Sequence, residues 1–124
     1  MINTSNPDKD LTRLLKSLKK RDEILKGIWI ARIYNYHFDV IRKITRKFID
    51  QNRQDELFYL LESENISYRR DMAGMLYHAY PEKCKEVLQE ISEMTVPNGL
   101  PKYYVNLSVS AYTSLKIGIP KDFP

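Results

Sequence analysis

Residues 57–76 have the sequence LFYLLESENISYRRDMAGML, and its pattern indicates the fold class of this chain. Its first part places Leu57, Leu60 and Leu61 on one face of a short helix, because residues at steps of three and four share a helix face. A polar turn follows, and Ser67 is expected to cap a second helix. That second helix carries Tyr68, Met72, Met75, Leu76 and Ala79 on one face. Two short helices joined by a polar turn form a helical hairpin.

Two further helices are expected before this hairpin. The first carries Leu11, Leu14, Leu15 and Leu18 on one face. We expect Asp8 or Asp10 to cap its start and Gly27 to end it. The second is expected over residues 28–52, which contain no glycine or proline. Its apolar stripe consists of Ile30, Ile33, Tyr34, His37, Ile41, Ile44 and Phe48.

Two more helices are expected after the hairpin. Pro81 suits the first turn of a helix, where its missing N–H costs no hydrogen bond. This helix is expected to bury Cys84, Val87, Leu88, Ile91 and Met94. Residues 96–101 are rich in turn-forming Pro, Asn and Gly, and the last helix is expected from Lys102 to Ile117, ending at Gly118. Its small residues, which let a neighbouring helix approach closely, are Ser108, Ser110, Ala111 and Ser114.

The helical spacing therefore predicts an all-α fold. Six helices joined by short turns form three consecutive hairpins, which stack into a short α-solenoid or close into a six-helix bundle. A chain of 124 residues suits one domain. We expect that domain to span residues 1–124, with residues 1–9 and 119–124 as flexible ends.

The central hairpin is similar to a HEAT repeat. The HEAT pattern has paired leucines, a turn, an apolar residue followed by arginine, and a leucine seven residues beyond that arginine. Leu60 and Leu61 match the pair, Tyr68 and Arg69 match the apolar-arginine step, and Leu76 matches the last position. The resemblance implies stacked hairpins, and it favours the α-solenoid over the closed bundle.

A longer resemblance covers residues 28–118. The order ARIYNYHFDVIRKI, the central hairpin, PEKCKEVLQEI, an Asn-Gly turn and AYTSLKIG resembles an uncharacterised bacterial family of small HEAT-like helical domains. The positions that carry the likeness are Asn35, Arg69, Leu88, Leu115 and Gly118. Some small helical proteins of this kind look like immunity proteins, which bind and block secreted bacterial toxins.

Composition restricts where the chain is expected to work. Cys84 is the one cysteine, so no internal disulfide can form, and a reducing compartment is favoured. The longest apolar stretch lies near residues 28–33 and falls far short of the roughly 20 residues of a membrane span. The polar start lacks the apolar run of a signal peptide. These observations predict a cytoplasmic protein.

Catalytic chemistry is nearly absent from the sequence. His37 lies on an apolar stripe, where a hydrogen-bonded core histidine is expected rather than a ligand. Asp71 and His78 are seven residues apart on one helix face and form a candidate pair, but no nucleophile stands beside them. No Cys/His spacing predicts a zinc site, and no glycine-rich loop predicts a phosphate site. We therefore expect no enzymatic activity, no metal and no cofactor.

Charge is distributed unevenly along the chain. Residues 1–54 carry thirteen Lys/Arg and six Asp/Glu, whereas residues 55–93 carry four and nine. In the basic part, a stripe on the long helix consists of Arg42, Lys43, Arg46 and Lys47. Such a stripe is either a solvated helix face or a surface that contacts nucleic-acid phosphates. Nucleic-acid binding through this stripe is the alternative function.

The acidic part holds a row of four glutamates at helical spacing: Glu82, Glu86, Glu90 and Glu93. Like charges one turn apart repel, so such a row is either an ordinary exposed face or a surface that meets a basic partner. The nine tyrosines exceed what a helical core needs, and tyrosine is enriched in interfaces. Those assigned to the same protein-binding surface are Tyr77, Tyr80 and Tyr103.

The leading prediction is a non-catalytic protein-binding module. Together with the family resemblance, the acidic row and the tyrosines predict an immunity protein that binds and occludes a bacterial toxin, such as a nuclease. A nuclease is a suitable partner because a site that holds phosphate is basic and complements a carboxylate row.

Overall fold

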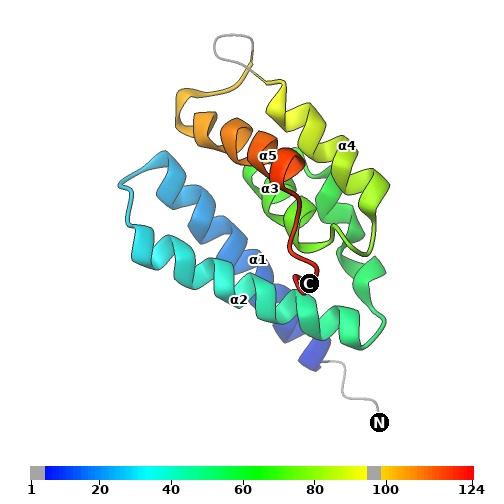
Figure 1. The fold of residues 1–124 in the computed structure, drawn as a ribbon. Helices are drawn as coiled ribbons and strands as arrows, with labels where there is room; N and C mark the ends of the chain where they lie inside the picture. Colours follow the sequence, from blue (N-terminus) through cyan, green and yellow to red (C-terminus); the bar gives the residue numbers. More distant parts are fainter. Residues whose placement is uncertain (1–4, 95–98) are drawn as a thin grey trace.

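The computed structural model describes residues 5–94 and 99–124, with side chains from residue 9 onward (Figure 1). These residues form helices and turns and no strand, which confirms the all-α prediction. The α-helices are α1 (Ser5–Lys26), α2 (Ala31–Asp50), α3 (Ile66–Met75), α4 (Pro81–Ser92) and α5 (Val105–Ile117). Two 3₁₀ helices, η1 (Gln54–Glu62) and η2 (Lys102–Tyr104), complete the order. Residues 96–98 of the turn expected over residues 96–101 lie outside the described residues.

The helices are arranged in pairs around α3 (Figure 1). α1 packs along α2, and α4 packs along α5, while η1 contacts α3. α3 also contacts α1, α4 and α5, and η2 lies against α1. The largest side chains that this arrangement buries completely include Phe48, Leu14, Leu18, Ile41, Leu57, Leu61, Met72, Met75, Leu76, Leu88 and Ile91. α3 is therefore the element on which both helix pairs depend.

Two of the predicted helix starts are wrong. Asn65 caps α3, since its side-chain oxygen accepts a hydrogen bond from the Tyr68 N–H at 3.1 Å. Ser67, the predicted cap, is buried inside the first turn. Asp8 and Asp10 lie within α1 rather than before it, because the helix already includes Ser5. Helical periodicity identifies the buried face of a helix, but it does not fix which polar residue caps the start of that helix.

The C-terminal side follows the prediction more closely. Pro81 occupies the first turn of α4, and Cys84, Val87, Leu88 and Ile91 are buried on its inner face. α5 ends at Gly118, whose φ of 92° is a conformation that glycine adopts without strain. The helices of the described residues include none that is both long enough and apolar enough to cross a bilayer.

The apolar stripe of α2 is only partly buried. Ile41, Ile44 and Phe48 are in the core, as predicted. Ile30 and Ile33 were expected beside them, but they are 41% and 37% exposed. The reason is their position next to the α1–α2 turn, which lies at the edge of the molecule and apart from α3 (Figure 1).

Residues 119–124, expected to be a flexible end, contact the body of the protein. Arg46 donates a hydrogen bond from Nη2 to the Asp122 carbonyl oxygen at 3.2 Å. His78 Nε2 lies 2.6 Å from the Pro120 carbonyl oxygen. The Phe123 ring stacks on Phe38 of α2 with a centroid distance of 5.9 Å. The segment thereby forms one side of a pocket described below.

Candidate functional site

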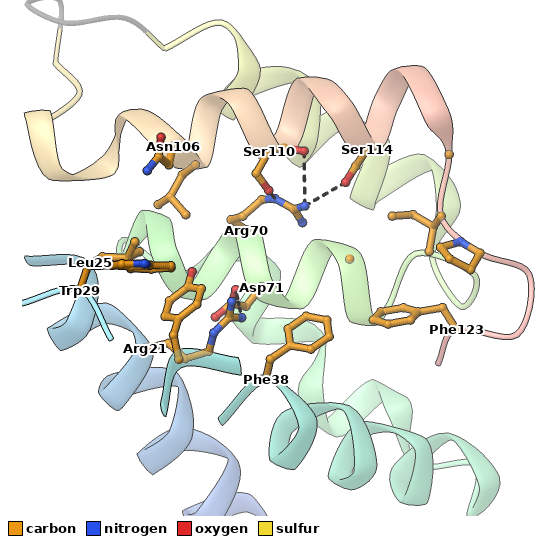
Figure 2. A pocket seen from close by; sticks show the side chains of 16 residues that line it. Arg21, Leu25, Trp29, Phe38, Arg70, Asp71, Asn106, Ser110, Ser114 and Phe123 are labelled. Atoms are coloured by element: carbon orange, nitrogen blue, oxygen red, sulfur yellow. Dashed lines mark hydrogen bonds and ion pairs between the residues drawn. The ribbon is translucent and has the colours of Figure 1, made fainter. Parts of the chain in front are cut away.

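A pocket of about 390 Å³ lies between the α1–α2 pair and α5, with α3 at its base (Figure 2). The segment that follows α5 closes one side with Ile119, Pro120 and Phe123. This volume falls within the range of small-molecule sites, which are concave and mostly apolar with a few polar groups. Because its lining combines an apolar wall with a buried ion pair at its base, we take it as the candidate functional site.

Aromatic side chains form much of the pocket wall. Trp29 and Tyr34 lie at a centroid distance of 4.8 Å, and Phe38 faces Phe123 (Figure 2). Trp29 is 57% exposed, so the pocket reaches the surface beside the α1–α2 turn. Burial raises the pKa of Tyr34 to about 12, and the nearby Asp71 carboxylate adds to this effect. Tyr34 therefore stays neutral throughout the physiological pH range.

The base of the pocket holds a buried ion pair. Arg21 Nη1 donates to Asp71 Oδ1 at 2.6 Å, and each residue is only 6% exposed. The Arg21 guanidinium carbon lies 3.8 Å from the centroid of the Tyr34 ring, a cation–π distance. Burial raises the pKa of Asp71, whereas the charges of Arg21 and Arg70 counteract it. Arg21 Nε and Asp71 Oδ2 are buried with no hydrogen-bond partner in the described part of the chain.

A second arginine, Arg70, links α3 to α5. Its Nε donates to Ser110 Oγ at 2.8 Å, and its Nη2 donates to Ser114 Oγ at 2.9 Å (Figure 2). Its Nη1 lies beside Gly74, where an added Cβ would come within 3.2 Å. Glycine at that position therefore leaves room for the guanidinium. Burial lowers the pKa of Arg70, and the charge of Asp71 opposes that change.

The predicted pair of Asp71 and His78 does not share a partner. Asp71 is buried and bound to Arg21, while His78 is exposed and contacts Pro120. His37 was expected to be a hydrogen-bonded core residue. Its hydrogen bond is confirmed, since Ser17 Oγ lies 3.0 Å from its Nδ1, but the residue is half-buried at the edge of the core. Burial lowers the pKa of His37, and the charges of Lys20, Arg21 and Lys16 lower it further.

The other candidate reactive groups of the described residues are the Cys84 thiol and the side chains that could hold a metal ion. Cys84 is buried, and burial raises its pKa to about 12, so the thiol is not activated. Residues 5–94 and 99–124 contain no group of three or more His, Cys, Asp and Glu side chains placed to hold a metal ion.

Of the four glutamates assigned to protein binding, Glu82, Glu86 and Glu90 lie exposed on α4, and Glu93 is exposed at its C-cap. Two of them form ion pairs: Glu90 with Arg69 at 3.1 Å, and Glu86 with Lys83 at 3.4 Å. Glu93 accepts a hydrogen bond from Gln89 instead. The row is therefore solvent-facing, with its charge partly offset by neighbouring cations.

The three tyrosines assigned to that surface lie in different places. Tyr77 and Tyr80 are half-buried at the α3–α4 turn, where the Tyr80 ring meets Phe58 at 4.9 Å. Tyr103 is exposed on η2, and its ring lies 5.8 Å from the ammonium of Lys26 on α1. None of the hydrogen bonds or ion pairs seen in the described residues joins these tyrosines to the glutamate row.

The basic stripe assigned to nucleic acid lies along α2, and three of its cations have carboxylate partners. Arg42 pairs with Asp39 at 3.9 Å, Arg46 with Asp50 at 3.6 Å and Lys47 with Asp10 at 2.8 Å. Lys43 lines a second pocket nearby, which is also lined by the acidic neighbours Asp10 and Asp39. Nucleic-acid binding stays a prediction, and the local pairing of charge does not strengthen it.

Sequence reasoning missed Arg21, Arg70, Ser110 and Ser114 as parts of one site. The small residues of α5 were predicted to allow a close helix approach, but Ser110 and Ser114 also accept hydrogen bonds from Arg70. One signal was present: two arginines directly before an acidic residue, at Arg69–Asp71, in the middle of an otherwise apolar helix.

Comparison with protein-family models, curated proteins and solved structures gives no match for this chain.

Proposed function

We propose that this chain is a non-catalytic protein-binding domain, and that it acts as an immunity protein that occludes a bacterial toxin. The observation that carries the proposal is the exposed row of glutamates on α4. A partner that meets this face has a basic surface, as a nuclease that holds phosphate does.

The proposed architecture is a short HEAT-like stack of three hairpins: α1–α2, η1–α3 and α4–α5. Its support is the order of contacts, since α3 contacts α1 of the first hairpin as well as α4 and α5 of the last hairpin. In such a stack each hairpin contacts mainly its neighbours in the sequence, and the outer faces remain available for a partner. α4 provides one of those outer faces (Figure 1).

Charge supports the choice of partner. Residues 55–93, which include α4, carry nine acidic and four basic side chains. Complementary charge accelerates the encounter of two proteins more than it slows their separation, and salt weakens this effect. Glu82 and Glu86 suit a test better than Glu90, because Glu90 also pairs with Arg69 of α3.

The test begins by isolating the partner with the tagged chain from its native host. Association rates are then measured at low and physiological salt for the wild type and for the double variant Glu82→Lys with Glu86→Lys. We expect the double variant to associate about tenfold more slowly at low salt, with a weaker salt dependence. Glu23→Lys, a single exposed reversal on α1, is the control for a charge change away from α4 and is expected to keep the wild-type rate.

Two outcomes would separate the parts of the proposal. An unchanged association rate in the double variant would show that the α4 face is not the contact. A partner that is harmless when expressed alone in the host would remove the immunity role and leave protein binding in place.

A further inference from the structure

We propose that the pocket between α1, α2, α3 and α5 binds a small organic monocarboxylate with an aromatic or alkyl body. The ligand's carboxylate binds Arg70, and its apolar body lies against the aromatic wall. This site is separate from the α4 face and independent of the protein-binding proposal.

The balance of charge in the pocket favours an anion. Its lining contains two guanidinium groups, Arg21 and Arg70, and a single carboxylate, Asp71. Asp71 is bound to Arg21. The hydrogen bonds of Arg70 go to hydroxyl and carbonyl oxygens of α5, which carry no charge. Even with Asp71 ionised, the lining therefore carries one excess positive charge, and a ligand with one negative charge neutralises it.

The geometry of Arg70 leaves donors available. Nε and Nη2 are bound to Ser110 and Ser114, which hold the guanidinium plane in place. Nη1 forms no hydrogen bond within the described residues and lies beside Gly74, itself part of the pocket lining. A guanidinium fixed on one edge and open on the other is preorganised to bind a carboxylate.

The shape of the pocket sets the size and the polarity of the ligand. A volume of about 390 Å³ corresponds to roughly a dozen non-hydrogen atoms, at about 30 Å³ for each water-sized group. Trp29, Tyr34, Phe38 and Phe123 form an apolar surface for the body of such a molecule. A polyanion such as a nucleotide is disfavoured, because Asp71 repels additional negative charge and the wall has few polar groups to solvate it.

The protein has a built-in reporter for this test. Trp29 is the only tryptophan of the chain and lies in the pocket wall, so its fluorescence reports on occupancy. We would titrate the full chain with 3-phenylpropionate, with its neutral amide, with 3-phenylpropylamine and with acetate. The first three share one body and differ in charge, while acetate has the charge without the body.

We expect 3-phenylpropionate to bind about tenfold to a hundredfold more tightly than the amide, the range that a charged hydrogen bond supplies. Acetate and the amine are expected to bind more weakly still. Equal affinity for carboxylate and amide, or tightest binding of the amine, would overturn the proposal. The absence of any Trp29 response to 3-phenylpropionate up to about 10 mM, matched by unchanged amide NMR signals, would also overturn it.

Two variants assign the effect to Arg70. Arg70→Gln is expected to bind the carboxylate no better than the amide. Arg42→Gln, which changes a half-buried arginine outside the pocket, should keep the preference. An equal loss of the preference for carboxylate in both variants would show that general charge attraction, not the site, accounts for binding.

Gly74→Ala is the second variant, since alanine favours the helix and its Cβ pushes against Nη1 of Arg70 at 3.2 Å. It should weaken carboxylate binding several-fold with amide binding unchanged, and unchanged carboxylate binding would exclude the Nη1 contact.

Discussion

Charged residues of the pocket and charged residues on the face of α4 are in opposite environments. At the pocket, Arg21 and Asp71 form an ion pair with side chains 7% and 5% exposed. On α4, Lys83 and Glu86 form a pair at 3.4 Å with side chains 28% and 72% exposed. Removing water from two charges costs several kcal/mol each, whereas an exposed pair loses little hydration and gains little. Two ion pairs of opposite charges therefore differ in how much the stability of the fold depends on them, and burial is the reason.

The largest expected effect comes from breaking the buried pair. Asp71→Ala leaves the Arg21 guanidinium buried without its carboxylate, so we expect the free energy of unfolding to fall by about 3–5 kcal/mol. Urea denaturation followed by circular dichroism measures this loss. Glu86→Ala on α4 is the comparison variant, and its effect should be much smaller. Losses of similar size in the two variants would show that burial does not separate the two regions.

An intermediate effect is expected at the hydrogen bonds that join α3 to α5. The double variant Ser110→Ala with Ser114→Ala removes two acceptors of Arg70, which should cost about 1–3 kcal/mol because a half-buried charged donor loses its partners. Ser108→Ala is the control, since this hydroxyl bonds only to the Val105 carbonyl oxygen of its own helix. If the double variant unfolds at the same urea concentration as the control, Arg70 does not hold α5 in place.

The smallest expected effect is the pH dependence of the free energy of unfolding that comes from His37, which lies near the positive charges of α1. Burial and the cations Lys20, Arg21 and Lys16 lower the pKa of His37 below its ordinary value. The folded state then favours neutral His37, so its contribution to stability is complete above the unfolded pKa, near 6.5, and is lost as pH falls through the folded pKa. The free energy of unfolding should therefore fall slightly as pH is lowered from 7 to 5, and His37→Gln should flatten this dependence. An NMR titration of His37 with a midpoint above 6.5 would contradict the assignment.

Much of the fold could be predicted because helix faces are encoded locally. The inner face of α4 follows from the spacing of Cys84, Val87, Leu88 and Ile91, and all four are buried. The same spacing failed for Ile30 and Ile33, because periodicity identifies a face but not whether another element covers it.

The pocket could not be predicted in the same way. Its polar contacts join residues far apart in the sequence: Arg21 and Asp71 are separated by 50 residues, and Arg70 and Ser110 by 40. Spacing within one helix carries no information on such partners. The surface row on α4 could be read from the sequence because three of its members belong to one helix and the fourth, Glu93, is the C-cap of that helix.

The long separation between Arg21 and Asp71 has a consequence for how the chain assembles. The antiparallel partners α1 and α2, and likewise α4 and α5, are close in the sequence and can meet early, because closing a short loop costs less conformational entropy. Arg21 reaches Asp71 only when α1 docks on α3. We therefore expect these charges to lose their hydration late in folding, when the local elements have already formed.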